Sequence, residues 1–387
     1  MEDTLESLFA DNVEEDIERL RRRKERVARM QREKREQMRR RRQMKLLFIK
    51  VILAIIPIMI IVVVISVIKK GNEQQEAVSI QIENLDTDVS EGIDMPLMEN
   101  MDVELPMLAV DSKESYSFVP TSSTSTIYNE EVISSHAILI DESANTIVAS
   151  KSAKERISPA SMTKVLTILV AAENITEEQL KDTCTMTREI TDYGYINDCS
   201  EVGFLEGEQI RVKDLFYGTI LPSGSDAAVG LAVYVAGSHE AFVEMLNEKL
   251  KELGLEESSH YTNCVGVYDE KHYSTVYDMA IIMKAAIQNE FCKEVLSRHN
   301  YITESTEQHP EGINISNWFL RRIEDKDTGG EVLCAKTGYV SQSKNCAVSY
   351  GEFANGKPYI CVTAGSSSSW RCIYDHVEIY NEYIRSS

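Results

Sequence analysis

The stretch Arg156-Ile157-Ser158-Pro159-Ala160-Ser161-Met162-Thr163-Lys164 decides the fold, because it opens a helix and places a serine three residues before a lysine. Ser158 is a typical N-cap residue, and Pro159 suits the first helical position, where its missing N–H costs nothing. Side chains at i and i+3 of a helix lie about 5–6 Å apart between Cβ atoms, so Lys164 can reach the Ser161 hydroxyl. The stretch predicts a nucleophile beside a base.

The residues that follow predict that this helix is buried. They are apolar at helical spacing: Val165, Leu166, Ile168, Leu169 and Ala172. A lysine beside apolar walls loses hydration, which disfavours its charged form, and a neutral amine can accept the serine proton. Ser-x-x-Lys also occurs at Ser66/Lys69 and Ser341/Lys344, so the pattern has weight only through its context.

The net charge of −21 is distributed unevenly along the 387 residues. Residues 1–70 contain 18 Lys or Arg against 11 Asp or Glu, whereas residues 71–387 contain 23 against 51. Residues 46–68 are apolar apart from Lys50, Pro57 and Ser66, a run long enough for a transmembrane helix. Because the basic residues lie before this run, the positive-inside rule predicts a cytoplasmic N-terminus.

We therefore expect four segments along the chain. They are a cytoplasmic basic tail at 1–45, a transmembrane helix at 46–68, an acidic disordered stalk at 69–126 and an extracellular folded domain at 127–387. A cleaved signal peptide is the alternative, but the basic region is too long and no small-residue cleavage site follows the apolar run. The plasma membrane is a predicted partner, and nucleic acid is not.

All eight cysteines lie in the predicted extracellular part: Cys184, Cys199, Cys264, Cys292, Cys334, Cys346, Cys361 and Cys372. An even number in an exported domain permits disulfides, with 105 possible connectivities. Free buried thiols are the alternative. The sequence leaves both open.

The folded part predicts an α+β arrangement, with an antiparallel sheet flanked by helices. An N-terminal hairpin is expected from His136–Ile140 and Thr146–Ser150, and C-terminal strands from Val332–Thr337, Cys346–Phe353 and Tyr359–Gly365. Asn355-Gly356 is a strong hairpin turn between the last two. Helices are expected from about Val212, at Ala227–Ala236, Glu240–Leu253, Met279–Ile287 after the capping box Thr275-x-x-Asp278, and at Arg371–Arg385.

Three short motifs occur in order: Ser161-Met162-Thr163-Lys164, Ser223-Gly224-Ser225 on a turn, and Lys336-Thr337-Gly338 closing a strand. Together they resemble the motif set of penicillin-binding proteins and serine β-lactamases. The resemblance extends from about His136 to Tyr383 and is closest to serine-type D-alanyl-D-alanine carboxypeptidases, the low-molecular-weight penicillin-binding proteins with a β-lactamase-like transpeptidase fold. It implies a protein of the bacterial cell membrane, with no metal or cofactor.

Residue roles follow from this resemblance. Ser161 would attack the carbonyl between the two D-alanines of a peptidoglycan stem peptide, Lys164 would take its proton, and Ser223 would relay a proton to the leaving D-alanine. The implied substrate-binding residues are Ser225, Lys336, Thr337, Gly338 and Tyr339, with the N–H groups of Ser161 and Tyr339 as the oxyanion hole. Penicillin and other β-lactams would acylate the same serine.

Two alternative functions stay open. Ser225 stands where the family usually has Asn, so a catalytically silent wall-binding or β-lactam-sensing protein is possible. A class A-like β-lactamase would need a glutamate that activates water, and the nearest match to its loop motif is Glu244-Met245-Leu246-Asn247, within a helix pattern. There is no His-Glu-x-x-His, Cys-x-x-Cys or Gly-x-Ser-x-Gly, so metalloproteases, zinc modules and α/β-hydrolases lack their signatures.

Overall fold

The computed structural model describes residues 116–384. The predicted basic tail, the predicted transmembrane helix and the predicted stalk up to residue 115 lie outside these residues. Within 116–384, none of the helices is both long and apolar enough to cross a membrane.

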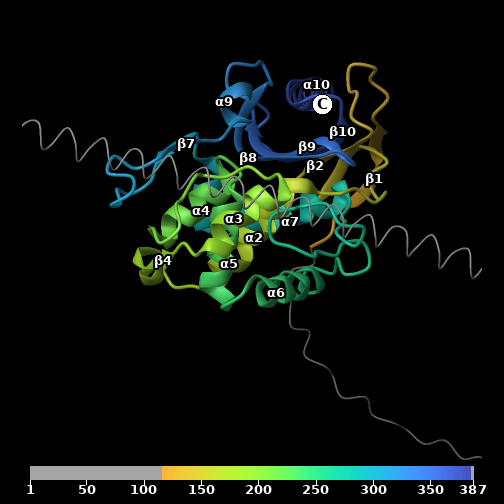
Figure 1. The fold of residues 1–387 in the computed structure, drawn as a ribbon. Helices are drawn as coiled ribbons and strands as arrows, with labels where there is room; N and C mark the ends of the chain where they lie inside the picture. Colours follow the sequence, from red (N-terminus) through yellow and green to blue (C-terminus); the bar gives the residue numbers. More distant parts are fainter. Residues whose placement is uncertain (1–115, 385–387) are drawn as a thin grey trace, which may run out of the picture. The chain divides into compact units, whose positions relative to one another are not determined.

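A six-stranded sheet divides the described part into two layers of helices (Figure 1). Its strand order is β1-β3-β2-β10-β9-β8, and every neighbouring pair is antiparallel except β1 and β3. The strands are β1 Val119–Thr126, β2 His136–Asp141, β3 Thr146–Lys151, β8 Gly330–Val340, β9 Lys344–Phe353 and β10 Pro358–Ser366. The predicted α+β class, N-terminal hairpin and C-terminal strands are confirmed.

Strand β1 corrects the predicted stalk boundary, because Val119–Thr126 belongs to the sheet and not to a disordered linker. The strand pairs in parallel with β3 at the sheet edge, and the Thr124 hydroxyl donates to the Ile147 carbonyl at 2.6 Å. The Ser/Thr run has the low hydrophobicity of a linker, because almost all of its side chains are exposed and need no apolar character. Pairing of an edge strand needs only backbone groups and tolerates such a sequence.

The middle of the chain supplies most of the helices, as predicted. The chain from 157 to 323 forms η1 Ala160–Met162, α2 Thr163–Glu173, η2 Glu178–Lys181, α3 Arg188–Asn197, α4 Val212–Ile220, α5 Ser225–Ala236, α6 His239–Glu252, α7 Val276–Gln288, α8 Glu290–Ser297 and α9 Leu320–Ile323. Two small ribbons, β4 Thr183–Thr185 with β5 Gln209–Arg211 and β6 Asn300–Ile302 with β7 Asn314–Ser316, connect them. The last helix is α10 Ser369–Ile384.

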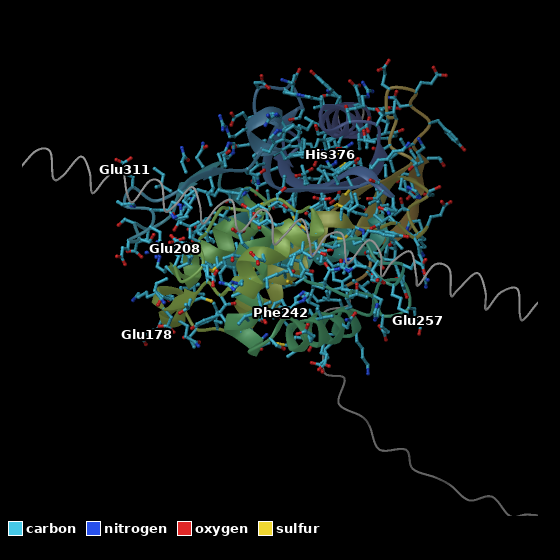
Figure 2. All side chains as sticks on the ribbon, in the orientation of Figure 1. Glu178, Glu208, Phe242, Glu257, Glu311 and His376 are labelled. Carbon is cyan, nitrogen blue, oxygen red and sulfur yellow. The ribbon has the colours of Figure 1, made fainter. Side chains whose placement is uncertain are left out.

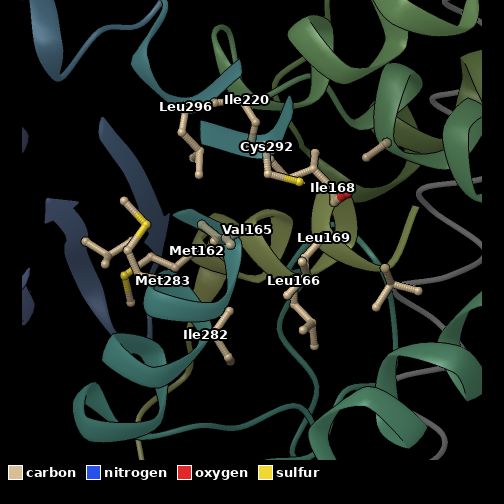
Figure 3. Packing of buried hydrophobic residues seen from close by; sticks show 14 of the residues in the cluster. Met162, Val165, Leu166, Ile168, Leu169, Ile220, Ile282, Met283, Cys292 and Leu296 are labelled. Atoms are coloured by element: carbon tan, nitrogen blue, oxygen red, sulfur yellow. Dashed lines mark hydrogen bonds between the residues drawn. The ribbon is translucent and has the colours of Figure 1, made fainter. Parts of the chain in front are cut away.

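The larger apolar core lies between the sheet and helices α2 to α8. Helix α2 runs through its centre, where Val165, Leu166, Ile168 and Leu169 pack among residues of α4, α7 and α8 (Figure 3). The helix is apolar on almost every side, so it is enclosed by other helices instead of presenting one face to solvent. Its N-terminal end is thereby fixed relative to the sheet.

A second core lies on the opposite face of the sheet, under α9 and α10 (Figure 1). It encloses the imidazole of His376, which is fully buried between α10 and the sheet (Figure 2). Its two ring nitrogens hydrogen-bond the hydroxyls of Ser349 at 2.8 Å and Thr363 at 3.0 Å. Burial lowers the pKa of His376 to about 3, so the ring is neutral at physiological pH.

Candidate active site

A cavity of about 760 Å³ lies where the end of β8 faces the helical layer. Its main walls come from four segments: η1 with Ser161, the α3–α5 region with Cys199, Ser200 and Ser223, the loop Val265–Tyr268, and Thr337–Gln342 at the end of β8. Ser316, Trp318, Asn345 and Ser369 also line it. Ser161, Ser223, Thr337, Gly338 and Tyr339 from the sequence prediction all line it. The three motifs therefore meet in one cavity.

Ser161 lies in the one-turn helix η1, immediately before α2. The expected N-cap at Ser158 is wrong, because the Ser158 hydroxyl has no hydrogen-bond partner among the described residues and α2 begins only at Thr163. Two glycines pack so closely against this turn that neither position has room for a Cβ atom. A Cβ atom on Gly266 would lie 1.8 Å from the Ala160 oxygen, and one on Gly338 would lie 2.9 Å from the Ser161 nitrogen.

Lys164 lies next to Ser161 and is buried, with 1% of its surface exposed. Its Nζ is 3.1 Å from Ser161 Oγ and donates to the Val265 carbonyl at 2.8 Å. Burial lowers the pKa of Lys164 to about 8, an effect that the Asp226 carboxylate partly opposes. About a tenth of such an amine is neutral at pH 7, and its lone pair can then accept the Ser161 proton while an N–H group remains bound to Val265.

A second buried lysine lies across the cavity on β8. Lys336 Nζ donates to Ser223 Oγ at 2.9 Å and to the Thr337 carbonyl at 2.7 Å. Burial and the repulsion of Lys164 hold the pKa of Lys336 well below its usual range. Ser223 has a φ of +64°, a strained conformation for a residue other than glycine, and this conformation belongs to the loop that carries its hydroxyl into the cavity.

Strand β8 forms the other wall and pairs with β9 on one side only. The side chain of Tyr339 is 64% exposed, so this residue offers the cavity both its backbone and an accessible ring. Gly338 is packed against η1, which brings the β8 backbone next to the Ser161 N–H. This juxtaposition suits an oxyanion hole built from the N–H groups of residues 161 and 339.

Three predicted site residues, Lys164, Lys336 and Ser225, are absent from the cavity walls, and of these only the two lysines hydrogen-bond a serine that lines it. Ser225 lies further from the proposed chemistry. It is the first residue of α5, fully buried, and is absent from the cavity walls. Its N–H donates to the Ser200 carbonyl at 2.8 Å, and its Oγ has no hydrogen-bond partner among the described residues. The position therefore supports the wall formed by Cys199 and Ser200, and direct substrate binding by Ser225 stays a prediction.

Two residues that the sequence analysis did not assign to the site, Asn263 and His272, hold the loop that binds Lys164. Asn263 Oδ1 accepts the N–H groups of Val265, Gly266 and Val267 at 3.2, 2.7 and 3.0 Å. An asparagine shortly before a glycine in a loop is a turn signal that would have found it.

His272 links this loop to the start of α2. Its Nδ1 accepts the Thr262 N–H at 3.1 Å, so the ring proton lies on Nε2, which bonds Thr163 Oγ1 at 2.9 Å. Burial lowers the pKa of His272 to about 3. The sequence analysis predicted a capping box at Thr275-x-x-Asp278 just after His272. That prediction is confirmed, because Thr275 Oγ1 accepts the Asp278 N–H at 2.9 Å to cap α7.

Asp226 is a third residue that the sequence analysis did not single out. Its buried carboxylate accepts the N–H groups of Val202, Gly203 and Phe204 at 2.9, 2.9 and 3.2 Å. It therefore orders the segment that follows Cys199 and Ser200. Its charge also favours the protonated form of Lys164.

The other candidate patterns do not reproduce the helical Ser-x-x-Lys arrangement, although Ser341 itself lines the cavity. Ser341 and Lys344 lie in and beside the β8–β9 turn and not on a helix, and Ser66 and Lys69 lie outside the described residues. Glu244 is exposed on α6, and Asn247 binds the backbone of Tyr261 through its amide. No disulfide joins any of the eight cysteines in this structure, and seven of the eight are buried.

The comparison with protein families agrees with this geometry. The model of the peptidase S11 family, described as D-alanyl-D-alanine carboxypeptidase, matches residues 122–368. The chain belongs to the D-alanyl-D-alanine carboxypeptidase family. The predicted family resemblance is thereby confirmed.

Relatives within the D-alanyl-D-alanine carboxypeptidase family are moderately similar in sequence. The chain is 31% identical over 235 residues to the D-alanyl-D-alanine carboxypeptidase DacF of Bacillus subtilis, covering 60% of this chain and 57% of that protein. It is 34% identical over 188 residues to DacC of Escherichia coli, covering 47% of each. The chain thus spans about half the length of the curated relatives it matches.

Solved structures show the same fold. A point mutant of the Streptomyces K15 DD-transpeptidase superposes with a TM-score of 0.60 at 23% identity, covering 66% of this chain and 98% of that one. Penicillin-binding protein 5 of Haemophilus influenzae gives a TM-score of 0.58 at 24% identity, covering 66% and 71%. The predicted DD-peptidase and β-lactamase-like fold is confirmed.

Proposed function

We propose that this family member is a serine D-alanyl-D-alanine carboxypeptidase, which removes the terminal D-alanine from peptidoglycan stem peptides and is acylated by penicillin. The main support is the contact of 3.1 Å between Ser161 Oγ and the buried amine of Lys164, whose pKa is lowered to about 8. A serine needs a neighbouring base to become a nucleophile at neutral pH. Family membership and the shared fold support the same reading.

Acylation begins when Ser161 Oγ attacks the carbonyl carbon between the two D-alanines. The neutral Lys164 amine takes the hydroxyl proton, and the N–H groups of Ser161 and Tyr339 stabilise the oxyanion, a contribution of about 2.7–4 kcal/mol per donor. The C–N bond then breaks, and Ser223 passes a proton to the departing D-alanine amine. The products are a Ser161 ester and free D-alanine.

Lys336 and Thr337 bind the terminal carboxylate of the substrate in this proposal. The Lys336 amine is deeply buried beside Lys164, and both effects disfavour its charged form. A substrate carboxylate supplies the missing counter-charge, so substrate binding and protonation of Lys336 favour each other. Lys336 also orients the Ser223 hydroxyl through a hydrogen bond of 2.9 Å.

Deacylation needs a water molecule and a base. Departure of D-alanine leaves space beside Lys164, which can take a proton from the incoming water. A β-lactam adduct retains its leaving group covalently, so it blocks this space. We expect penicillin adducts that last minutes or longer, because Glu244 is exposed on α6 and does not line the cavity.

The proposed location is the bacterial cell membrane, with one N-terminal span, the N-terminus in the cytoplasm and the catalytic domain outside. The support is the apolar run at 46–68 and the basic residues before it. Protease added to intact cells or spheroplasts should release the folded domain. A domain protected from the protease would contradict this topology.

The central experiment treats the full chain with a fluorescent penicillin and measures D-alanine release from a pentapeptide mimic. Mass spectrometry should locate the adduct on Ser161, and D-alanine should be released catalytically. Adduct formation without D-alanine release would support a β-lactam-sensing protein instead. Rapid, repeated penicillin hydrolysis without D-alanine release would support a β-lactamase.

A further inference from the structure

Both tryptophans of the chain, 52 residues apart in sequence, meet at one side of the active-site cavity. Trp318, just before α9, and Trp370, in the first turn of α10, are in edge-to-face contact, with ring centroids 5.8 Å apart. Trp318 and Ser369 line the cavity, as does the exposed ring of Tyr339. We call Trp318, Trp370, Tyr339 and the adjacent Arg322 the aromatic rim.

Arg322 holds the two indoles of the aromatic rim in place. Its guanidinium carbon lies 3.9 Å from the ring centre of Trp318 and 5.1 Å from that of Trp370, and its Nη1 donates to the Trp318 carbonyl at 3.2 Å. A cation stacked on an aromatic ring restricts the motion of that ring. A ligand that binds later then loses less free energy to ordering the ring. The rings are therefore ordered before anything binds.

The Trp370 ring is 48% exposed, and Tyr374, one helical turn further on α10, is 39% exposed. Positions i and i+4 share a face, so α10 presents two aromatic side chains on its exposed side. An exposed aromatic group beside a cavity indicates a binding surface, because Trp and Tyr combine a large apolar face with a polar edge.

We propose that the aromatic rim binds the glycan strand of peptidoglycan by stacking its indole and phenol rings on the apolar faces of the N-acetylated sugar rings. This inference rests on the proposed function, since the stem peptide that enters the cavity is covalently attached to that strand. Continuity of the rim with the cavity places a surface for sugar rings beside the site that takes the peptide.

Charge also favours this ligand over an anionic polymer. Residues 116–384 contain 21 Lys or Arg against 39 Asp or Glu, so the described part repels polyanions. Arg322 is the cation of the rim, and its guanidinium face is already stacked on Trp318. A largely uncharged, ring-shaped ligand fits such a surface, and stacking on aromatic rings needs no charge.

The binding test uses the intrinsic fluorescence of the full chain, to which only Trp318 and Trp370 contribute as tryptophans. Glycan oligomers from which the stem peptides have been removed should change this fluorescence saturably. Trp370→Ala should weaken the glycan affinity about three- to tenfold, and Trp370→Phe should restore most of it. Tyr128→Ala, which removes a ring that is 84% exposed and does not line the cavity, should have no effect.

The kinetic test compares D-alanine release from a sugar-free pentapeptide and from the same pentapeptide attached to a glycan oligomer. In the wild type, kcat/KM should be about three- to tenfold higher for the glycan-linked substrate, mainly through KM. Trp370→Ala should remove this preference and leave kcat/KM on the sugar-free peptide unchanged.

The outcomes separate this inference from the proposed function. Release of D-alanine from the sugar-free peptide, with no preference for the linked substrate and no fluorescence response, would overturn glycan binding and leave the carboxypeptidase standing. Absence of D-alanine release from either substrate, with an intact fluorescence titration, would overturn the carboxypeptidase alone. Equal losses of kcat/KM on both substrates in Trp370→Ala would show that the aromatic rim has a structural role and would overturn glycan binding. A change in oligomeric state in the absence of glycan would show that the rim mediates self-association instead.

Discussion

The helical layer and the sheet each contribute one buried lysine that binds a serine of the cavity wall. The two lysines make the same kinds of hydrogen bond, but their positions arise in different ways. Each donates to one serine hydroxyl, at 3.1 Å for Lys164 and 2.9 Å for Lys336, and to one backbone carbonyl, at 2.8 and 2.7 Å. Lys164 reaches its serine within one helical turn, whereas Lys336 reaches Ser223 across 113 residues of sequence.

The difference lies in the charges around the two amines. Burial lowers the pKa of Lys164 to about 8, and neighbouring groups that include the Asp226 carboxylate oppose this shift. The charges acting on Lys336 include the repulsion of Lys164, which adds to the effect of burial. One amine is thus suited to exchange a proton near neutral pH, and the other becomes charged when it gains an anion. The same side chain serves as base in one place and as anion receptor in the other.

Alanine substitution of Ser161 and of Ser223 should give the largest difference in penicillin acylation. Ser161→Ala removes the nucleophile and should abolish the penicillin adduct, whereas Ser223→Ala removes a proton relay and should slow adduct formation about 10²–10⁴-fold. Intact-mass spectrometry over time measures both. Ser341→Ala tests the other described Ser-x-x-Lys serine, which also lines the cavity but lies in the β8–β9 turn and not on a helix, and it should keep the adduct. An adduct that survives Ser161→Ala would contradict the assignment.

Removal of each amine should separate the two roles kinetically. Lys164→Met should lower the maximal acylation rate about 10²–10⁴-fold, because the base is lost. Lys336→Met should act chiefly on the penicillin concentration at half-maximal rate, because the carboxylate partner is lost. Stopped-flow acylation over a range of penicillin concentrations distinguishes these effects. Identical losses in maximal rate for the two variants would remove the proposed division of labour.

The pH dependence of acylation tests the base directly. Because the neutral form of Lys164 accepts the proton, the rate should rise about thirtyfold from pH 6.5 to pH 9 and level off above the lowered pKa of about 8. Circular dichroism at each pH controls for unfolding. A rate that is flat across this range would show that the base titrates elsewhere.

The histidine that supports Lys164 should affect stability more than chemistry. His272 and His376 have folded-state pKa values lowered to about 3, so the unfolded chain binds more protons below pH 6.5. The free energy of unfolding should therefore be fully retained above pH 6.5 and fall as the pH drops towards 3, by up to about 1.4 kcal/mol per pH unit for each histidine. Denaturant unfolding at several pH values measures it.

Comparison with His272→Asn identifies the histidine contribution. The variant should show a shallower loss of stability on acidification, since one buried histidine with a lowered pKa no longer titrates while His376 and His239 still do. An unchanged slope would mean that other groups govern acid unfolding.

Changes at Ser225 should be the smallest. Ser225→Ala removes a buried hydroxyl without a hydrogen-bond partner among the described residues, so kcat/KM for D-alanine release should stay within about threefold of wild type. Ser225→Asn should stay within about tenfold. A tenfold loss in the alanine variant would restore Ser225 to the substrate-binding residues, and activity that appears only in the asparagine variant would mark the natural protein as silent.

The sequence was sufficient for the parts of the site that depend on local spacing. Ser161 and Lys164 are predictable because a helix fixes the distance between positions i and i+3. The Lys336–Ser223 contact depends on how β8 docks on the helical layer, and the sequence did not predict it; only the family resemblance placed the two residues in one site. Strand β1 was missed because pairing through backbone groups is not visible in side-chain chemistry. The burial of Ser225 behind the wall is likewise not predictable from its residue type, and its role in substrate binding stays a prediction.

The parallel edge strand β1 has a mechanical consequence. The described chain enters the sheet at β1, and four strands separate this strand from β8, a distance of about 24 Å at ordinary strand spacing. Its register with β3 is interrupted between Pro120 and Ser125, so it is the least continuous pairing on that side. Tension applied to the residues before Val119 would first have to break the contacts of the buried Phe118 with Tyr277 on α7, and β1 would detach next. Both would yield before the load distorts the catalytic strand β8.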